Sequence, residues 1–398
     1  MRSFYLTALI LGLLTAVGPL AINMYLPALP AIEEEFDTDT ATVQLSLLSF
    51  FVSMSLAQLV YGPLSDMYGR KRPLFVGLSL YLLGAVGSAL AQDIGWLIAA
   101  RAVQGLGAAA GMVIARAVIR DLYTGPEAAQ LMATLMLVIS IAPVLAPLAG
   151  SAALTMGGWQ TIFWSMAAAA VAALVLLSTA LKETRPPEQR GESNIARSLR
   201  DYGLLLRMPR FLGIVLVGGF GLASFMIYVA NSSFILIDHY ELSPTQYSLA
   251  FSINAAGFIG VAQLNGYLSR RFGLGPIIRF ATAANVMIML VLLGAELAGA
   301  APLPLMIVLL LLGYACLGLV VPGTAVLALE DHGERAGTAS ALMGALQFTT
   351  ATLMIGIAGI FFNGTPVPMI VAIVTCSAIA FVLAMAAVPR RDATATAG

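Results

Sequence analysis

The stretch from Gly62 to Pro73 reads Gly-Pro-Leu-Ser-Asp-Met-Tyr-Gly-Arg-Lys-Arg-Pro and separates two long apolar runs. It brings one acid, two glycines and three consecutive cations into a single short turn. The whole chain is 60% hydrophobic and only 10% charged, so few charges are available to it. Cations between membrane-spanning runs are concentrated on the cytoplasmic side. The stretch therefore indicates a cytoplasmic turn of a polytopic membrane protein.

The composition excludes a soluble globular domain, because a chain of 398 residues with so little polar surface could not cover its core. The apolar runs are long enough to cross about 30 Å of hydrocarbon as helices. Twelve are predicted, at about residues 4–29, 42–63, 73–91, 94–119, 127–155, 159–181, 211–237, 246–268, 274–298, 302–329, 336–361 and 366–388. The first run is interpreted as a membrane helix, since it is too long for a signal peptide. The sequence therefore predicts an all-α membrane protein.

The positions of the cations predict the orientation of the chain. Of the twenty Lys and Arg residues, all except Arg101 and Arg116 fall on one side if both termini are cytoplasmic. The predicted outer loops carry only acidic charges. The net charge of zero argues against a nucleic-acid partner. Cys316 and Cys376 lie in separate apolar runs, so a disulfide is not expected.

A long polar connection at 182–210 divides the chain. Six apolar runs precede it in residues 1–181 and six follow it in residues 211–398. The segment Gly266–Gly273 echoes the Gly62–Pro73 turn at the matching place in the second half. We therefore expect two six-helix bundles related as parallel repeats, with a substrate cavity between them.

The polar connection is also predicted to contain a short helix. Apolar residues recur at helical spacing between cations, namely Ile195, Leu199, Tyr202 and Leu206, and Ser193 is a candidate N-cap. Such a helix would lie on the inner leaflet with its cations near anionic headgroups. A simple tether between the halves is the alternative interpretation.

Several stretches resemble motifs of the major facilitator superfamily. Gly62–Pro73 is similar to its loop between helices two and three, and Leu97–Ala109 is similar to its fourth-helix motif. Ala142–Ser151 resembles the fifth-helix antiporter motif with fewer glycines. Three further stretches resemble the twelve-span drug:proton antiporters of the bicyclomycin/chloramphenicol-resistance (Bcr/CflA) branch. They are Met24–Pro30, Ala115–Tyr123 and Ala336–Ser340. The resemblance covers the whole chain and implies a monomer with two pseudo-symmetric six-helix bundles in the bacterial inner membrane.

The turn has a mechanical interpretation. Gly62 and Gly69 would permit close helix approach and a tight reversal, while Asp66 would be a desolvated carboxylate that needs a partner. The resemblance implies that Arg70 and Arg72 contact neighbouring helix ends in one conformation and release them in another. We therefore expect a conformational latch that biases an alternating-access equilibrium. The alternative is that the cations only fix the topology.

Arg101 is the charge that most needs a partner. It lies about 9–12 Å below the outer end of its helix, where an arginine is costly unless it faces a cavity or a counter-group. The resemblance implies that its partner is an acid in the first helix, titrated by the transported proton. Asn23 occupies that place, at a similar depth of about 10 Å, so contact between the two residues is expected.

An amide cannot titrate, and it resembles only the protonated form of the expected aspartate. Three alternatives follow: the chain is a substituted form of a parent with aspartate at position 23, another group carries the proton, or the protein is a facilitator without proton coupling. We favour the substituted form.

The predicted fifth helix combines two prolines with a ridge of small residues. Pro143 and Pro147 are expected to kink it, while Ala142, Ala146 and Gly150 form a smooth surface for close packing. The similar motif of antiporters seals a seam on one side of the membrane. Plain small-residue packing is the alternative, although it does not require the prolines.

Candidate substrate-binding residues are polar or aromatic side chains inside apolar runs. They are Tyr25, Gln58, Gln104, Met136, Tyr228, Asn231, Phe251, Asn254, Tyr314 and Gln347. Aromatic walls with a few hydrogen-bonding groups suit moderately hydrophobic compounds. Packing between helices explains such residues equally well.

The predicted function is proton-coupled efflux of small amphipathic drugs or metabolites through the lipid bilayer, with coupling impaired at position 23. A membrane sensor or scaffold of the same fold, or a facilitator or importer of a small metabolite, is the alternative. No catalytic, metal-binding or phosphate-binding pattern stands out, so neither an enzyme nor a cofactor is expected.

Overall fold

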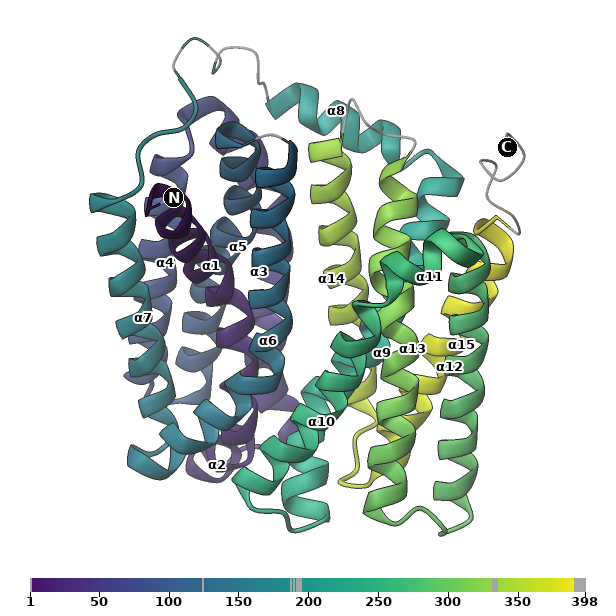
Figure 1. Ribbon diagram of the computed structural model, residues 1–398. Helices are drawn as coiled ribbons and strands as arrows, with labels where there is room; N and C mark the ends of the chain where they lie inside the picture. The colour runs from purple at the N-terminus through teal and green to yellow at the C-terminus, as the bar shows by residue number, and fades with distance from the viewer. Residues whose placement is uncertain are drawn as a thin grey trace. The chain divides into compact units, whose positions relative to one another are not determined.

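The computed structural model describes residues 2–123, 125–186, 188, 190, 195–330 and 336–389. Figure 1 draws its helices. The chain forms two compact units, Met1–Arg200 and Asp201–Gly398. The boundary between them falls inside the polar connection 182–210.

The helices of the first unit follow the predicted apolar runs. They are α1 (Arg2–Asn23), η1 (Leu26–Ala28), α2 (Leu29–Glu35), α3 (Thr40–Tyr68), α4 (Lys71–Ala89), α5 (Ile94–Leu122), α6 (Gly125–Gly157) and α7 (Trp159–Thr179). The first run is broken: α1 ends at Asn23, and a 3-10 turn precedes α2. Pro27 and Pro30 lie in the first turns of η1 and α2, where the missing N–H group costs no helical hydrogen bond.

The short helix predicted in the polar connection is present as α8 (Ile195–Leu205). Tyr202 is buried, whereas Leu199 and Leu206 are exposed. Ser193, the candidate N-cap, lies outside the described residues.

The second unit repeats the series of long helices. They are α9 (Pro209–Ser233), the π-helical η3 (Phe234–His239), α10 (Pro244–Ala262), α11 (Asn265–Phe272), α12 (Leu274–Leu297), α13 (Leu303–Glu330), α14 (Ala336–Ile360) and α15 (Pro366–Ala387). The helices α10 and α11 form one bent pair, with an angle of 41° between them.

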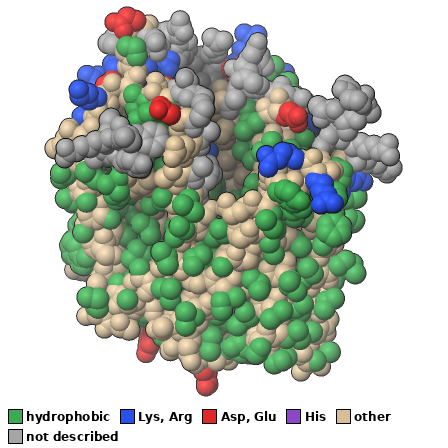
Figure 2. Space-filling model, viewed as in Figure 1, with side chains coloured by type: hydrophobic (Ala, Val, Ile, Leu, Met, Phe, Trp, Pro, Cys, Tyr) green, Lys and Arg blue, Asp and Glu red, His purple; other side chains and the backbone are tan. Residues whose placement is uncertain are grey.

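The prediction of an all-α membrane protein is confirmed. All described secondary structure is helical. Eleven described helices are long and apolar enough to cross a membrane, or twelve if the bent pair counts as one span. Figure 2 shows apolar side chains over the middle of each unit, with Lys and Arg near its upper end.

The two units share one packing pattern. In the first, α5 packs against α3 and α4, α7 against α4, and α1 against α5, α6 and α7. In the second, α13 packs against α10 and α12, α15 against α12, and α9 against α13, α14 and α15. Each helix pair of one unit therefore has a counterpart in the other, which is the pattern of an internal repeat.

The echo between the two turns extends to the backbone. Gly69, after α3, has φ 87°, and Gly273, after α11, has φ 82°. This left-handed region is open to glycine but strained for residues with a side chain. Both glycines reverse the chain into the helix that follows.

Candidate functional site

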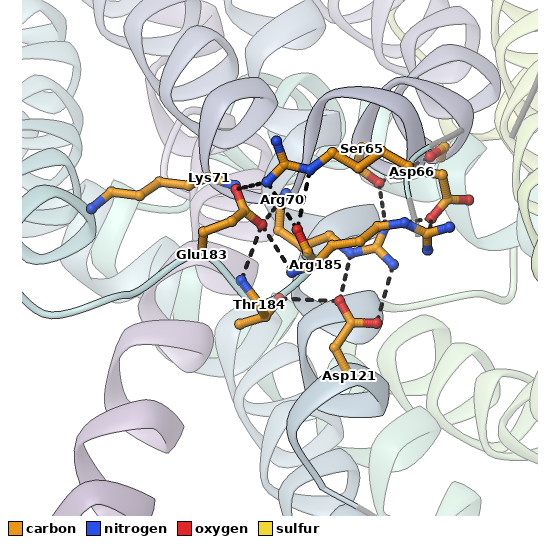
Figure 3. A network of polar contacts seen from close by, with 10 residues as sticks. Ser65, Asp66, Arg70, Lys71, Asp121, Glu183, Thr184 and Arg185 are labelled. Atoms are coloured by element: carbon orange, nitrogen blue, oxygen red, sulfur yellow. Dashed lines mark hydrogen bonds and ion pairs between the residues drawn. The ribbon is translucent and has the colours of Figure 1, made fainter. Parts of the chain in front are cut away.

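Arg70 joins the last turns of α3 and α5 (Figure 3). Its Nε and Nη2 donate to the two carboxylate oxygens of Asp121 at 2.7 and 3.2 Å. Its Nη1 donates to Asp66 Oδ1 at 2.6 Å and to Ser65 Oγ at 2.8 Å. Carboxylates are unfavourable near the negative end of a helix dipole, so one buried cation compensates two such ends. We call Ser65, Asp66, Arg70 and Asp121 the latch.

The three residues Glu183–Arg185, which follow α7, bind the latch and are called the strap. The Glu183 carboxylate accepts hydrogen bonds from the backbone N–H groups of Arg70 at 2.8 Å and Lys71 at 3.2 Å. Thr184 Oγ1 donates to Asp121 Oδ2 at 3.0 Å, and Arg185 Nη1 donates to Asp66 Oδ1 at 2.9 Å. The strap therefore caps the start of α4 and contacts both latch acids (Figure 3).

The charges of the latch and strap stabilise one another. Burial raises the pKa of Glu183, but backbone N–H groups, including those of Arg185 and Arg70, outweigh it and hold the pKa below its usual value. Burial likewise lowers the pKa of Arg70, but the hydrogen bond to Asp121 and the charge of Asp66 outweigh it and raise the pKa. Both side chains are therefore charged at neutral pH.

Gly62 and Arg72, which were predicted to belong to the latch, do not have the expected contacts in this structure. A Cβ at Gly62 would meet no atom within 4 Å, so close helix approach does not require glycine there. Arg72 is exposed and makes no polar contact within the described part of the chain. A Cβ at Gly69 would collide with the Glu183 carboxylate, so this glycine serves both the reversal and the strap. Besides Arg70, the turn reaches a neighbouring helix end through Lys71, whose Nζ donates to the carbonyl of Ser178 in the last turn of α7 at 3.0 Å.

Arg101, on α5, is completely buried in a cage of aromatic rings. Its Cζ lies 4.4 Å from the ring centre of Phe50, 4.7 Å from that of Tyr25 and 5.8 Å from that of Phe163. These rings come from α3, from the break after α1 and from α7. Nη1 donates to Gln104 Oε1 at 2.6 Å, one turn along α5. We call Arg101 and the three rings the Arg101 cage.

The guanidinium of Arg101 has no anionic partner among the described residues. Its Nε and Nη2 are buried and make no hydrogen bond. A cation–π contact returns about 0.5–2 kcal/mol, whereas a buried charge that lacks its partner costs about 3–5 kcal/mol. The rings and Gln104 offset some of this cost, but Nε and Nη2 stay without a hydrogen bond in the described structure, so the polar contacts of the guanidinium are incomplete.

The expected hydrogen bond between Asn23 and Arg101 is not present in the described structure. Asn23 is buried, but its Nδ2 donates to the backbone carbonyl of Pro19 at 2.8 Å. The amide thus satisfies a carbonyl of its own helix at the end of α1. The residue after the next, Tyr25, is the one that reaches Arg101, because the helix break turns its ring into the bundle.

Small residues let neighbouring helices approach the cage. A Cβ at Gly105 would collide with the backbone of Phe50, so glycine there permits the close contact of α5 with α3. A Cβ at Gly150, on α6, would collide with the carbonyl of Met24 at the helix break. Ala142 and Ala146 are also buried, and α6 runs as one helix through Pro143 and Pro147.

The second unit contains its own polar and aromatic group, formed by Tyr228, Phe251, Asn254 and Tyr314, which we call the Asn254 cluster. The rings of Tyr228 and Phe251 stack with centres 5.6 Å apart, and those of Tyr228 and Tyr314 are 5.4 Å apart. Asn254 Nδ2 donates to the Tyr228 hydroxyl at 2.9 Å. Asn254 Oδ1 and the Tyr314 hydroxyl are buried without a hydrogen-bond partner in the described structure.

A family model described as Major Facilitator Superfamily matches residues 11–355. The chain belongs to this superfamily. An uncharacterised transporter of the same type from Bacillus subtilis is 35% identical over 364 residues, which is 91% of this chain and 90% of the relative. The resemblance predicted from the motifs is confirmed.

More distant relatives carry names that refer to drugs. A bicyclomycin resistance protein homologue of Haemophilus influenzae is 28% identical and covers 94% of both chains. The multidrug resistance protein MdtL of Escherichia coli is also 28% identical, over 96% of this chain and 95% of its own. Among solved structures, a D-xylose–proton symporter has TM-score 0.75 at 17% identity and covers 98% of both chains, which supports the fold.

The other predicted binding residues of this transporter do not all gather in one site. Asn231 donates to the Ile227 carbonyl of its own helix at 2.8 Å. Gln58 and Gln347 are buried, and the Nε2 of each has no partner in the described structure. The side chain of Met136 lies outside the described residues. Among the predicted binding residues with described side chains, Tyr25 and Gln104 join Arg101. Tyr228, Phe251, Asn254 and Tyr314 join one another.

Several residues that complete these sites are not predicted from the sequence. Phe50 and Phe163 are aromatic residues in apolar helices, where most aromatic side chains are ordinary core residues. Asp121 and the strap lie far from the turn in sequence, so only the fold brings them to Arg70. Acidic residues near the ends of other predicted helices, opposite in charge to Arg70, were the available signal.

Proposed function

We propose that this transporter exports small amphipathic compounds across the bacterial inner membrane by alternating access, as a monomer with both termini in the cytoplasm. Membership of the superfamily gives the class of activity. The relatives named for multidrug and bicyclomycin resistance support efflux of small drug-like compounds. The observation that carries the proposal is the Arg101 cage, a buried cation with two unused donors inside a membrane-spanning bundle.

The Arg101 cage is the proposed recognition group of the first unit, and the Asn254 cluster is a separate candidate in the second unit. Both combine aromatic walls with a few buried hydrogen-bonding atoms that have no partner in the described structure. Such walls accept apolar bodies of different shape, and the polar atoms fix the orientation. Structural packing alone would leave fewer polar atoms unsatisfied, since buried polar groups in proteins are nearly always paired.

The latch and strap would set the balance between conformations. They hold the ends of α3 and α5 and the start of α4 in one arrangement through charged groups near the membrane surface. A change of arrangement within this unit has to break the contacts of Arg70 or Glu183. The proposed role is therefore to stabilise one state of the transport cycle without touching the substrate.

Proton coupling is proposed to be impaired by Asn23. In the described membrane-spanning helices, every Asp and Glu lies near a helix end. The interior of the spans therefore lacks a carboxylate that could carry a proton, and the amide of Asn23 cannot titrate. A facilitator without proton coupling is the second candidate function, and the same observation favours it.

Transport by reconstituted vesicles tests these proposals. Proteoliposomes with wild-type protein or Asn23→Asp are given a drug panel with and without an imposed pH gradient. We expect gradient-independent movement of at least one compound by wild type and a gradient-driven gain in Asn23→Asp. Equal gradient-driven transport by both would show that another group carries the proton. Movement of no compound by either would support a sensor or scaffold, and movement of a nutrient alone would support an importer.

A further inference from the structure

The unused part of Arg101 is one defined edge of its guanidinium. The flat cation has five N–H donors arranged as a fork. The rings of Phe50 and Tyr25 lie near its Cζ at 4.4 and 4.7 Å, and Nη1 is held by Gln104. The remaining donors, on Nε and Nη2, point along the same edge and have no partner in the described structure.

This edge has the geometry that binds a planar oxyanion. Parallel N–H groups of an arginine donate to the two oxygens of one carboxylate, and such charge-assisted pairs are shorter and stronger than neutral hydrogen bonds. The latch contains the same arrangement: the Nε and Nη2 of Arg70 bind the two oxygens of Asp121. Arg101 presents the same pair of donors with no carboxylate on them.

The chain itself supplies no anion to Arg101. The ion pairs among the described residues join Arg70, Arg185 and Arg190 to acids of the latch and strap. Asn23, the nearest expected source of an acid, is a neutral amide that is bonded to Pro19. The positive charge of the cage is therefore uncompensated within this unit as described.

One wall of the cage comes from a break in a helix. Tyr25 lies in the break between α1 and η1, where the helix is interrupted inside a membrane-spanning run. Its hydroxyl is paired with Ser46 Oγ at 2.9 Å, and its ring covers Arg101. Interrupted helices at membrane depth are found where a transporter binds its substrate.

We propose that the Nε and Nη2 edge of Arg101 binds two oxygens of a carboxylate or sulfonate group of the transported compound, so that the substrates are small aromatic acids. This inference rests on the proposed function and names its substrate class. The aromatic body lies against the rings of the cage, and the oxyanion neutralises Arg101. Asn23 fits this reading, because an aspartate there would place a competing negative charge in the same bundle.

Matched probes test the charge preference. Naphthalene-2-sulfonate is permanently anionic and does not cross a bilayer as a neutral acid, whereas naphthalene-2-sulfonamide has the same body without the charge. Binding of each to the purified full-length chain is measured by calorimetry, and uptake is measured in proteoliposomes. We expect wild type to bind the sulfonate about tenfold more tightly than the sulfonamide, as charge-assisted pairing in a dry site implies.

The preference should depend on the arginine fork. In Arg101→Met it should disappear, and in Arg101→Lys, which keeps the charge but not the fork, it should fall to about threefold. Arg116→Met, which removes another arginine of α5, should keep the wild-type preference. Equal binding of both probes by wild type, or an unchanged preference in a folded Arg101 variant, overturns the inference. If wild type moves neutral drugs but rejects the sulfonate, the inference alone fails; if it moves no compound, the proposed function fails.

Discussion

The Nε of Arg70 lies 2.7 Å from Oδ2 of Asp121, and this pair connects the turn after α3 to the last turn of α5. The two residues are 51 positions apart in the sequence. Arg70 is 4% exposed, so its charge depends on Asp121 and Asp66 for compensation. The neighbouring cation Arg72 is exposed. Substitution of each arginine in turn therefore compares a buried cation with an exposed one in the same turn.

Arg70→Met should therefore destabilise the protein far more than Arg72→Met. Loss of Arg70 leaves Asp121 without a cation and Asp66 with Arg185 alone, and we expect the free energy of unfolding to fall by about 3 kcal/mol. Loss of the exposed Arg72 should change it by less than about 0.5 kcal/mol. Thermal unfolding in detergent measures both variants. Equal effects would mean that the cations of the turn serve only to fix topology.

Removal of the strap charge should give a pH-dependent loss of stability. The pKa of Glu183 is lower in the folded chain, so its stabilisation is present above the unfolded pKa of about 4.3 and is lost as the pH falls through the folded pKa. Glu183→Gln should therefore unfold at a lower temperature than wild type at neutral pH. The difference between the two unfolding temperatures should become smaller in acid. Glu188→Gln, at an exposed position, is the control and should leave the dependence of the unfolding temperature on pH unchanged. A gap that is constant with pH would contradict this account of the strap.

A methyl group at Gly105 should disturb the Arg101 cage. Gly105→Ala would press on Ser53 and the backbone of Phe50, and we expect a loss of about 1–3 kcal/mol in stability from this overpacking. Gly62→Ala meets open space inside α3 and should gain about 1 kcal/mol from helix propensity. Thermal unfolding compares the two. If Gly105→Ala proved as stable as Gly62→Ala, close packing of α3 on α5 would not shape the cage.

Two tyrosine hydroxyls of the Asn254 cluster should behave differently. Tyr228→Phe removes the acceptor of Asn254 and leaves a buried amide N–H unpaired, which costs about 1–3 kcal/mol. The Tyr314 hydroxyl has no partner in the described structure, so Tyr314→Phe should be neutral or slightly stabilising. If the cluster binds substrate, Tyr314→Phe should lower transport while stability is kept. A Tyr314→Phe variant that is unstable, or that transports as wild type does, would remove this hydroxyl from the binding site.

The membrane helices could be predicted because lipid leaves the backbone few choices. Every backbone polar group in the hydrocarbon has to be paired, so long apolar runs become helices, and the observed bounds follow the predicted runs. The break at Tyr25 was not predicted, since apolar residues continue through it and a hydropathy window averages over it. Pro27 and Pro30 were the local signal for that break.

The sites were harder to predict than the spans. Arg101 could be singled out because a charge inside an apolar run is costly. Its aromatic neighbours Phe50 and Phe163 could not, because they come from different helices and resemble ordinary core residues. No hydrogen bond joins Asn23 to Arg101 in the described structure, because equal depth does not fix the direction of a side chain and the Asn23 amide donates to the carbonyl of Pro19.

Substrate exchange by the reconstituted wild-type chain is the most direct test of the central claim, that this protein is a transporter whose site includes Arg101. Proteoliposomes are loaded with an unlabelled compound of the drug panel, and entry of the same labelled compound is followed without any ion gradient. The account predicts transient accumulation of at least one compound by wild type and its loss in Arg101→Met. Accumulation of no compound above empty liposomes, or equal accumulation by folded Arg101→Met, would contradict it.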